Sequence, residues 1–184
     1  MGYAELADRI TRIEDRLEIE QLPIRYALAV DSRDVESWLA LFVPDVLVGP
    51  QDRGREALRA FITPRLRWFY RSIHQIVGHR VELLGTDTAR GQVYCRAEHE
   101  VGERWIVMPI RYDDEYRKVD GQWLFARRRE HHWYAVDVTD RPQSVAFNGW
   151  DIASGPPDLP GAAATWSTFW TGNETSDITG QPVH

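Results

Sequence analysis

Cysteine is nearly absent from this chain: Cys95 is the single cysteine among 184 residues. One cysteine cannot form an internal disulfide and cannot supply a cysteine-based zinc site. The histidines show no H-x-x-x-H or H-x-H spacing with an accompanying carboxylate, so we expect neither a metal site nor a cofactor. The low cysteine content favours a reducing, cytoplasmic compartment.

Positive charge and long hydrophobic runs are also scarce. The chain has 22 Lys and Arg against 28 Asp and Glu, a net charge of −6 and a pI of about 5.5. Its only basic run, residues 127–129, reads as part of a strand with alternating faces. We therefore expect no nucleic-acid partner and no anionic membrane surface, because both favour basic patches. No apolar run approaches the roughly 18 residues of a membrane span, and the first ten residues lack the apolar core of a signal peptide.

The sequence predicts one domain over residues 1–140 and an extension over residues 141–184. The extension is rich in proline and glycine, which argues against regular structure. It also contains large apolar side chains, and we expect these to pack on the domain or on a neighbouring subunit: Phe147, Trp150, Trp166, Phe169 and Trp170.

The first 70 residues have a helical pattern. Apolar residues recur at spacings of three and four from Leu6 to Leu17, which predicts an amphipathic helix. Proline lacks a backbone donor, so Pro23 is expected to kink or break this helix before a second helical stretch that ends at Asp31. A short helix over 35–42 capped by Asp34 or Ser32, a short strand over 45–49 and a helix over 54–70 interrupted at Pro64 follow.

After residue 71 the pattern changes to strand alternation, with candidate strands at 72–84, 88–101, 104–118 and 122–135. Asp120-Gly121 between the last two is a strong hairpin signal, and the last three strands should form a meander. Helices followed by long strands predict an α+β fold. We expect a strongly curved mixed or antiparallel sheet, packed against the N-terminal helices as a cone with an apolar pocket inside.

Three ionisable residues interrupt these apolar patterns. Asp31 ends a helical stretch that also contains Tyr26, His74 opens the first long strand, and His99 falls on the apolar side of the second strand. Burial of such groups is costly without partners, so their position predicts an acid/base cluster in an apolar pocket. The alternatives are a helix-capping role for Asp31 and structural histidines in the core.

The order of these elements, with the motifs RYALAVDSRDVESWLALFVPDV, SIHQIVGH and EYRKVDGQWLFARR, resembles the SnoaL-like branch of the nuclear transport factor 2 superfamily. The resemblance covers roughly residues 5–135. It is greatest to the group of scytalone dehydratase, bile-acid dehydratase and hexachlorocyclohexane dehydrochlorinase. Val30 departs from the tyrosine that scytalone dehydratase has at this place, so its substrate geometry is not carried over.

The resemblance implies a proton-handling dyad of Asp31 and His74, with Tyr26 and His99 as hydrogen-bond donors and Arg128 as a group that polarises a carbonyl or steers a leaving anion. Arg128 has an alternative role in an ion pair with a carboxylate such as Glu98 or Glu130. The other histidines that we considered are expected to be structural or on the surface, and Cys95 to act as a small hydrophobe: His79, His131 and His132.

Three functions fit this pattern. The first is a cofactor-independent lyase, a dehydratase or related eliminating enzyme, acting on a small cyclic or aromatic hydrophobic compound. The second is an isomerase, cyclase or C–C cleaving (retro-aldol) lyase that uses the same dyad. The third is a non-catalytic accessory subunit, like the small subunit of ring-hydroxylating dioxygenases. The resemblance also implies a homo-oligomer, with a trimer favoured over a dimer.

Overall fold

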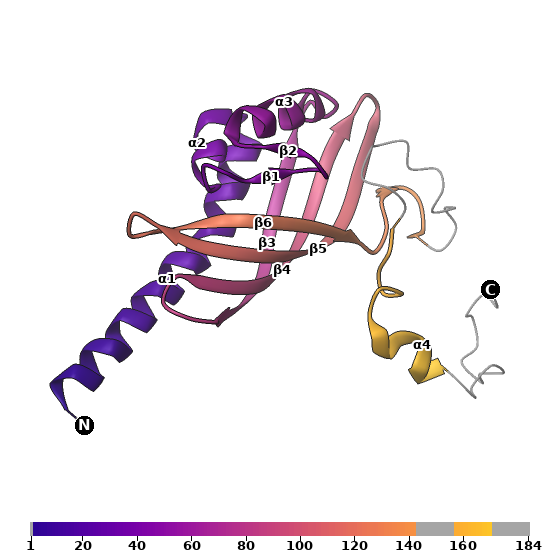
Figure 1. Cartoon of the computed structure of the whole chain (residues 1–184). Helices are drawn as coiled ribbons and strands as arrows, with labels where there is room; N and C mark the ends of the chain where they lie inside the picture. The colour runs from indigo at the N-terminus through magenta and orange to yellow at the C-terminus, as the bar shows by residue number, and fades with distance from the viewer. Residues whose placement is uncertain (1, 143–156, 171–184) are drawn as a thin grey trace.

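The computed structural model describes residues 2–142 and 157–170 and has the α+β architecture that the sequence predicts (Figure 1). Helices α1 (Tyr3–Asp31), α2 (Val35–Ala40) and α3 (Arg55–Leu66) lie on one side of a curved sheet. No helix among these described residues is long and apolar enough to cross a membrane.

The sheet is antiparallel throughout. Its strands are β3 (Ser72–Leu83), β4 (Thr88–Val101), β5 (Arg104–Val119) and β6 (Gln122–His132), paired in chain order, and β7 (Val136–Asp137) pairs with β5. The hairpin at Asp120-Gly121 is confirmed, since both residues have positive φ, 50° and 80°, as a two-residue turn requires.

Two bulges bend this sheet. The register shifts between Ile76 and Gly78 on β3, and between Glu115 and Tyr116 where β5 pairs with β6. A bulge adds one residue to one strand, which bends that strand and moves the following side chains to the other face. Beyond the second bulge, the residues that face the inside of the cone on β6 are therefore Arg128 and every second residue after it.

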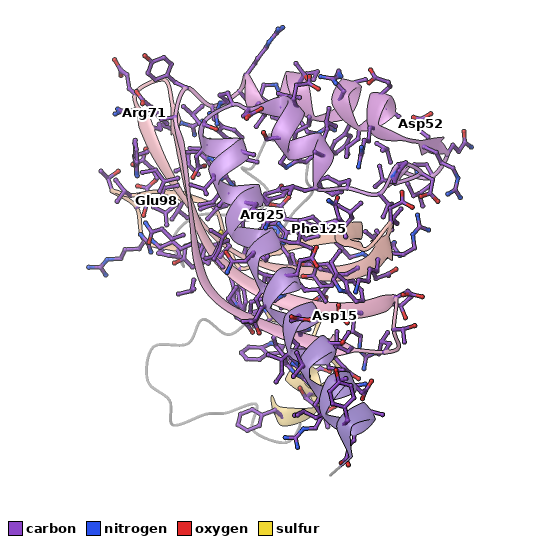
Figure 2. All side chains as sticks on the ribbon, turned by 90° about the vertical axis from the view of Figure 1, so that its left-hand side faces the viewer. Asp15, Arg25, Asp52, Arg71, Glu98 and Phe125 are labelled. Atoms are coloured by element: carbon purple, nitrogen blue, oxygen red, sulfur yellow. The ribbon has the colours of Figure 1, made fainter. Side chains whose placement is uncertain are left out.

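Helix α1 is continuous through Pro23, so of the kink or break that we expected at this residue, the break is wrong. Proline removes only one intrahelical hydrogen bond, and Pro23 is fully buried together with Ile19 and Leu22. The free energy gained by burying this face of α1 against the sheet outweighs the cost of a proline inside the helix. Figure 2 shows α1 running lengthwise over the sheet.

The same helix has an apolar stripe that is not covered. The side chains whose spacing predicted the helix, from Leu6 to Leu17, are about half exposed, and the first turns of α1 extend beyond the sheet (Figure 1). The periodicity therefore predicted the helix correctly, although this apolar stripe is not the face that packs on the sheet.

The segment after α1 closes one end of the cone. The Asp34 carboxylate accepts a hydrogen bond from the Ser37 amide and caps α2, which confirms one of the two predicted caps. A two-stranded hairpin, β1 (Leu47–Val48) and β2 (Asp52–Arg53), leads to α3. Helix α3 continues through Pro64, where we expected an interruption, and ends two residues later.

Within the described part of the C-terminal extension, residues 158 and 159 contact the end of β6. The amides of Asp158 and Leu159 both donate to the carbonyl of His132, and Leu159 is buried. Helix α4 (Ala164–Trp170) follows, with Trp166 and Phe169 exposed. Phe147 and Trp150 lie outside the described residues, and the packing of the extension as a whole stays a prediction.

Gly91 on β4 packs closely against the neighbouring strands β3 and β5, and a substitution can test this packing. A Cβ atom at this position would lie 2.9 Å from the Arg80 carbonyl oxygen and 3.0 Å from the Tyr116 ring. We predict that Gly91→Ala lowers the free energy of unfolding by about 1–3 kcal/mol, the usual cost of overpacking. Gly78→Ala is the matched control, because its Cβ would meet nothing within 4 Å. Urea unfolding checks the pair, and equal stability of the two variants would contradict this packing.

Candidate active site

Asp31 and His74 are brought together where α1 meets β3. The Asp31 carboxylate lies 2.7 Å (Oδ1) from Nδ1 of the His74 ring, and its Oδ2 accepts a hydrogen bond of 2.9 Å from the His74 amide. The His74 side chain is only 7% exposed, against 28% for Asp31. One carboxylate thus fixes both the backbone and the ring of His74, and Nε2 is the ring nitrogen left for a bound molecule.

His99 lies next to this pair on β4. Its ring is centred 5.4 Å from that of His74 and stacks on Phe69 at 4.1 Å. Burial, together with the nearby His74, lowers the pKa of His99 to about 3, so the imidazole is neutral over the physiological range. His99 thus lies on the inner, apolar side of β4, as the strand alternation predicted.

Two residues that the sequence did not single out hold His99. Nδ1 of His99 lies 3.0 Å from the Ser72 hydroxyl, which accepts a hydrogen bond of 3.1 Å from Arg33. The Arg33 guanidinium also donates to the carbonyls of Val30 and Phe69. Arg33 has φ of 62°, an uncommon conformation for a residue with a side chain, and it turns the chain sharply after Asp31.

Tyr26 and Arg128 lie together on the cavity wall. The Arg128 guanidinium carbon is 4.4 Å from the Tyr26 ring centroid, 4.1 Å from that of Tyr112 and 4.3 Å from that of Phe125. Burial raises the pKa of Tyr26 to about 12, so its hydroxyl keeps its proton. Such contacts place a cation against several aromatic faces, which is a favourable arrangement for a desolvated arginine.

Arg128 is paired with Asp114 rather than with Glu98 or Glu130. Nε and Nη2 donate to the two carboxylate oxygens at 2.8 and 2.7 Å, and the Asp114 side chain is fully buried. Burial opposes the charge of Arg128, but the Asp114 carboxylate outweighs it and raises the pKa of Arg128. The bulge in β5–β6 explains the partner, because it places Asp114 opposite Arg128 in the register.

The third nitrogen of Arg128 has no such partner. Nη1 is buried without a hydrogen bond among the described residues, and Arg128 lines the cavity.

Behind Arg128, the Asp114 carboxylate accepts a hydrogen bond of 2.9 Å from the Tyr116 hydroxyl, which lies 3.0 Å from Nε2 of His79. This buried chain of side chains fixes the orientation of Arg128, and it gives His79 a structural role.

Glu130 and His132 are cavity residues that the sequence analysis missed. They follow Arg128 at intervals of two along β6, and all three line the cavity. Glu130 Oε1 lies 3.3 Å from Nε2 of His132. Desolvation in the cavity opposes ionisation of Glu130, but the contact with His132 and the charge of Arg128 hold the pKa of Glu130 below its usual range, so it is a carboxylate at neutral pH. His132 is buried, so of the two expected roles, structural or on the surface, the surface role is wrong.

The cavity that these residues share has a volume of about 560 Å³, within the range of small-molecule sites. Helices α1, α2 and α3 and the inner face of the sheet form its walls. Most of the lining is apolar or aromatic, including Trp38, Phe42, Leu58, Ile62 and Met108. Cys95 packs beside it in a buried apolar cluster, and burial raises the pKa of its thiol to about 12, which makes it an unreactive hydrophobe.

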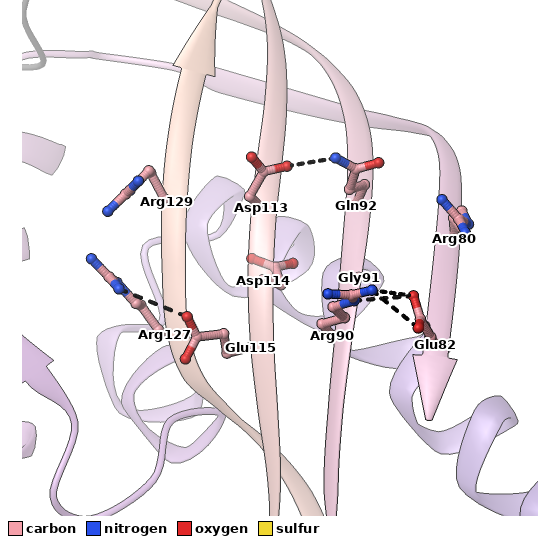
Figure 3. Close-up of a pocket in the computed structure, with 10 residues that line it drawn as sticks. All are labelled: Arg80, Glu82, Arg90, Gly91, Gln92, Asp113, Asp114, Glu115, Arg127 and Arg129. Atoms are coloured by element: carbon pink, nitrogen blue, oxygen red, sulfur yellow. Dashed lines mark hydrogen bonds and ion pairs between the residues drawn. The ribbon is translucent and has the colours of Figure 1, made fainter. Parts of the chain in front are cut away.

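A second hollow lies on the outer face of the sheet (Figure 3) and has a volume of about 420 Å³. Its charged side chains largely neutralise one another: Arg90 pairs with Glu82 at 2.9 Å and Arg127 with Glu115 at 3.7 Å. It contains neither an apolar wall nor a histidine. The inner cavity is therefore the candidate active site.

The site contains carboxylate and imidazole groups, but the described residues include no group of three or more His, Cys, Asp or Glu side chains that could hold a metal ion. Tyr26, Asp31, His74, His99 and Arg128, the five residues predicted from the sequence, all lie in or directly behind the cavity.

Comparisons with known proteins agree with this fold. A family model described as a SnoaL-like domain matches residues 11–129. An uncharacterized protein of Mycobacterium tuberculosis (strain H37Rv) is 29% identical over 129 residues, which cover 66% of this chain and 87% of that protein.

Two solved structures show the same fold. A hexachlorocyclohexane dehydrochlorinase from Novosphingobium barchaimii LL02 superposes with a TM-score of 0.63 at 21% identity, over 72% of this chain and 96% of that one. A scytalone dehydratase-like protein from Novosphingobium aromaticivorans gives a TM-score of 0.62 at 24% identity, over 73% and 94%. The chain therefore belongs to the SnoaL-like family with the NTF2-like fold, and the matched segment contains all five residues predicted for the site.

Proposed function

We propose that this chain is a cofactor-independent lyase that eliminates water or a related small leaving group from a small cyclic or aromatic hydrophobic compound. The observation that carries the proposal is the contact of 2.7 Å between Asp31 and Nδ1 of His74, with the His74 ring at the wall of an apolar cavity. An imidazole held in this way is a general base.

In the proposed reaction, Nε2 of His74 removes a proton from a carbon next to the one that carries the leaving group. The electron pair of the broken C–H bond forms the C=C bond, and the leaving group departs with its own bonding pair. Asp31 stabilises the imidazolium that forms. For a leaving hydroxyl, the proton on His74 can then pass to the departing oxygen, so that water leaves and the imidazole is neutral again.

Three donors support the charge that develops on oxygen. Arg33 can only donate, so the Ser72 hydroxyl is best satisfied by donating its own hydrogen to Nδ1 of His99, which places the ring proton on Nε2. Tyr26 keeps its hydroxyl proton, and Nη1 of Arg128 has no other hydrogen-bond partner among the described residues. Such donors are most effective in a site of low dielectric.

The cavity supports a substrate that is flat or cyclic, largely apolar and polar at one end. Aromatic side chains from α1, α2 and β5 line it, and Glu130 and His132, 3.3 Å apart, add polar groups on β6. A hydroxyl or a protonated amine on the substrate could bind the Glu130 carboxylate. The named relatives with this fold include a dehydrochlorinase and a dehydratase-like protein, which fits an elimination.

An isomerase, a cyclase or a C–C cleaving lyase would use the same base. The mass of the product separates these reactions, since elimination removes a small molecule, isomerisation leaves the mass unchanged and C–C cleavage divides the substrate. An accessory subunit would be expected to have a filled pocket or an unpaired Asp31. The open cavity and the Asp31–His74 contact favour an enzyme.

We predict that His74→Ala and Asp31→Asn each lower turnover by at least about 100-fold, the usual contribution of acid/base groups, while the protein stays folded. The measurement is product formation, followed by mass spectrometry, with a panel of hydroxylated polycyclic, steroid and lignin-derived compounds. Circular dichroism checks the fold.

His131→Gln is the matched control for this experiment. His131 is a histidine on β6 that contacts Asp113 and Asp158 but does not line the cavity, so its variant should keep turnover within a few fold. Near wild-type activity of His74→Ala would remove the proposed mechanism.

A second prediction follows from the neutral state of His99. In the unfolded chain this histidine takes up a proton below a pKa of about 6.5, whereas the native residue does so only near 3. Native His99 thus binds fewer protons between these values, and the free energy of unfolding falls as the pH falls through this window, by up to about 1.4 kcal/mol per pH unit.

Replacement of His99 by a residue that does not titrate should remove this dependence. Urea unfolding of the wild type and of His99→Gln at several pH values between about 7.5 and 5 gives the two slopes, and we expect a flatter slope for the variant. Parallel slopes would show that native His99 is protonated as readily as in the unfolded chain.

A further inference from the structure

Glu130 is the one acidic residue among the described residues that line the inner cavity. It lies on β6 between Arg128 and His132 and faces the inside of the cone, yet its side chain is 40% exposed. The exposed surface is therefore surface of the cavity. The other carboxylate of the site, Asp31, is already occupied by the amide and the ring of His74. Glu130 is thus the carboxylate that a bound molecule meets.

The protein itself supplies little for this carboxylate to bind. The nearest donor is His132, whose Nε2 lies 3.3 Å from Oε1 of Glu130, but this nitrogen is buried without a hydrogen-bond partner, so the two groups are close and not aligned. No other described side chain donates a hydrogen bond to Glu130. A charged group that loses water without gaining a donor is costly. A molecule that fills the cavity must therefore bring a donor to Glu130.

Glu130 and His74 lie on different walls of the cavity. Their strands, β6 and β3, are the two ends of the strand order β3-β4-β5-β6, and both residues line the same space. The inner face of β4 and β5 lies between them, with Tyr112 directly opposite Glu130 in the register. A cyclic molecule that presents a C–H bond to His74 thus has its far end near Glu130.

The charges in this wall favour a neutral donor over a cation. Arg128 is two residues from Glu130 on the same face of β6 and carries a positive charge. A protonated amine would have to give up its hydration and approach this guanidinium, whereas a hydroxyl is cheaper to desolvate and can donate its single hydrogen to the carboxylate. A carboxylate on the ligand would meet Glu130 with the same sign of charge, which disfavours it.

We propose that Glu130 determines substrate specificity, by accepting a hydrogen bond from a neutral phenolic or alicyclic hydroxyl at the end of the substrate that lies away from His74. The inference rests on the proposed function in one respect, that this cavity binds the substrate, and it gives Glu130 no step in the reaction. A molecule without the hydroxyl displaces water from Glu130 and leaves the carboxylate unpaired. Sites built to bind a hydroxyl reject the analogue that lacks it for this reason.

The first experiment compares four naphthalenes that carry a hydroxymethyl, ethyl, aminomethyl or carboxylate group at the same ring position. Equilibrium dialysis at neutral pH measures their dissociation constants for the full chain. We expect the hydroxymethyl compound to bind at least about tenfold more tightly than each of the other three, the usual effect of a hydrogen bond to a charged group. A smaller preference over any of them, or no measurable binding of the hydroxymethyl compound, would overturn the proposal.

Variants then assign the preference to Glu130. Glu130→Leu should bring the hydroxymethyl and ethyl compounds to within a few fold of each other. Glu130→Gln, which has the same shape and keeps an acceptor oxygen, should retain only part of the preference. Glu115→Leu is the matched control, because Glu115 lies on the outer face of the sheet and pairs with Arg127 (Figure 3), so it should keep the full preference. An undiminished preference in either Glu130 variant would contradict the assignment.

His74→Ala separates this inference from the proposed reaction. Binding of the naphthalenes needs no proton transfer, so this variant should keep the preference for the hydroxymethyl compound while it loses turnover. A preference that depends on Glu130 in a protein without lyase activity would support the specificity site and reject the lyase. Turnover that depends on His74, without any preference for the hydroxyl, would reject the role of Glu130 alone.

Discussion

The Asp31 carboxylate joins the last turn of α1 to the first long strand, and the shape of the cavity depends on this contact. One oxygen holds the His74 amide and the other lies against the His74 ring, so helix, strand and imidazole are positioned by a single side chain. Arg33 strengthens the same junction through the carbonyls of Val30 and Phe69. A residue at the end of a helix usually serves as a cap or in a turn, but here it determines which nitrogen of His74 faces the cavity.

A second constraint is the burial of charge in the cone. Arg128 and Asp114 are both removed from water, and a buried ion pair is stable only when its remaining polar atoms have partners. Tyr116 satisfies part of this need for Asp114, and three aromatic rings surround the guanidinium. The nitrogen left over, Nη1, is buried without a hydrogen-bond partner among the described residues, and Arg128 as a whole lines the cavity. The pairing with Asp114 thus explains why a charged group can be maintained at the wall of an apolar cavity.

Local patterns in the sequence predicted much of this fold. Strand alternation and turn residues placed the four long strands within a few residues and put His99 on the inner face. Patterns of this kind cannot weigh tertiary packing: burial keeps α1 intact at Pro23 despite the local cost. Nor can they show a bulge. The register shift at Glu115 and Tyr116 turns Arg128, Glu130 and His132 inward together, so two cavity residues and the partner of Arg128 were missed.

The proposed mechanism requires that Asp31 fix one tautomer of His74, with the proton on Nδ1 and the lone pair of Nε2 toward the cavity. Nitrogen NMR of the ¹⁵N-labelled protein at about pH 9 measures this directly, with the His74 signals assigned by their loss in His74→Gln. We expect a protonated Nδ1 and an unprotonated Nε2 in the wild type, and a loss of this preference in Asp31→Asn. A proton on Nε2 of wild-type His74 would contradict the proposed base.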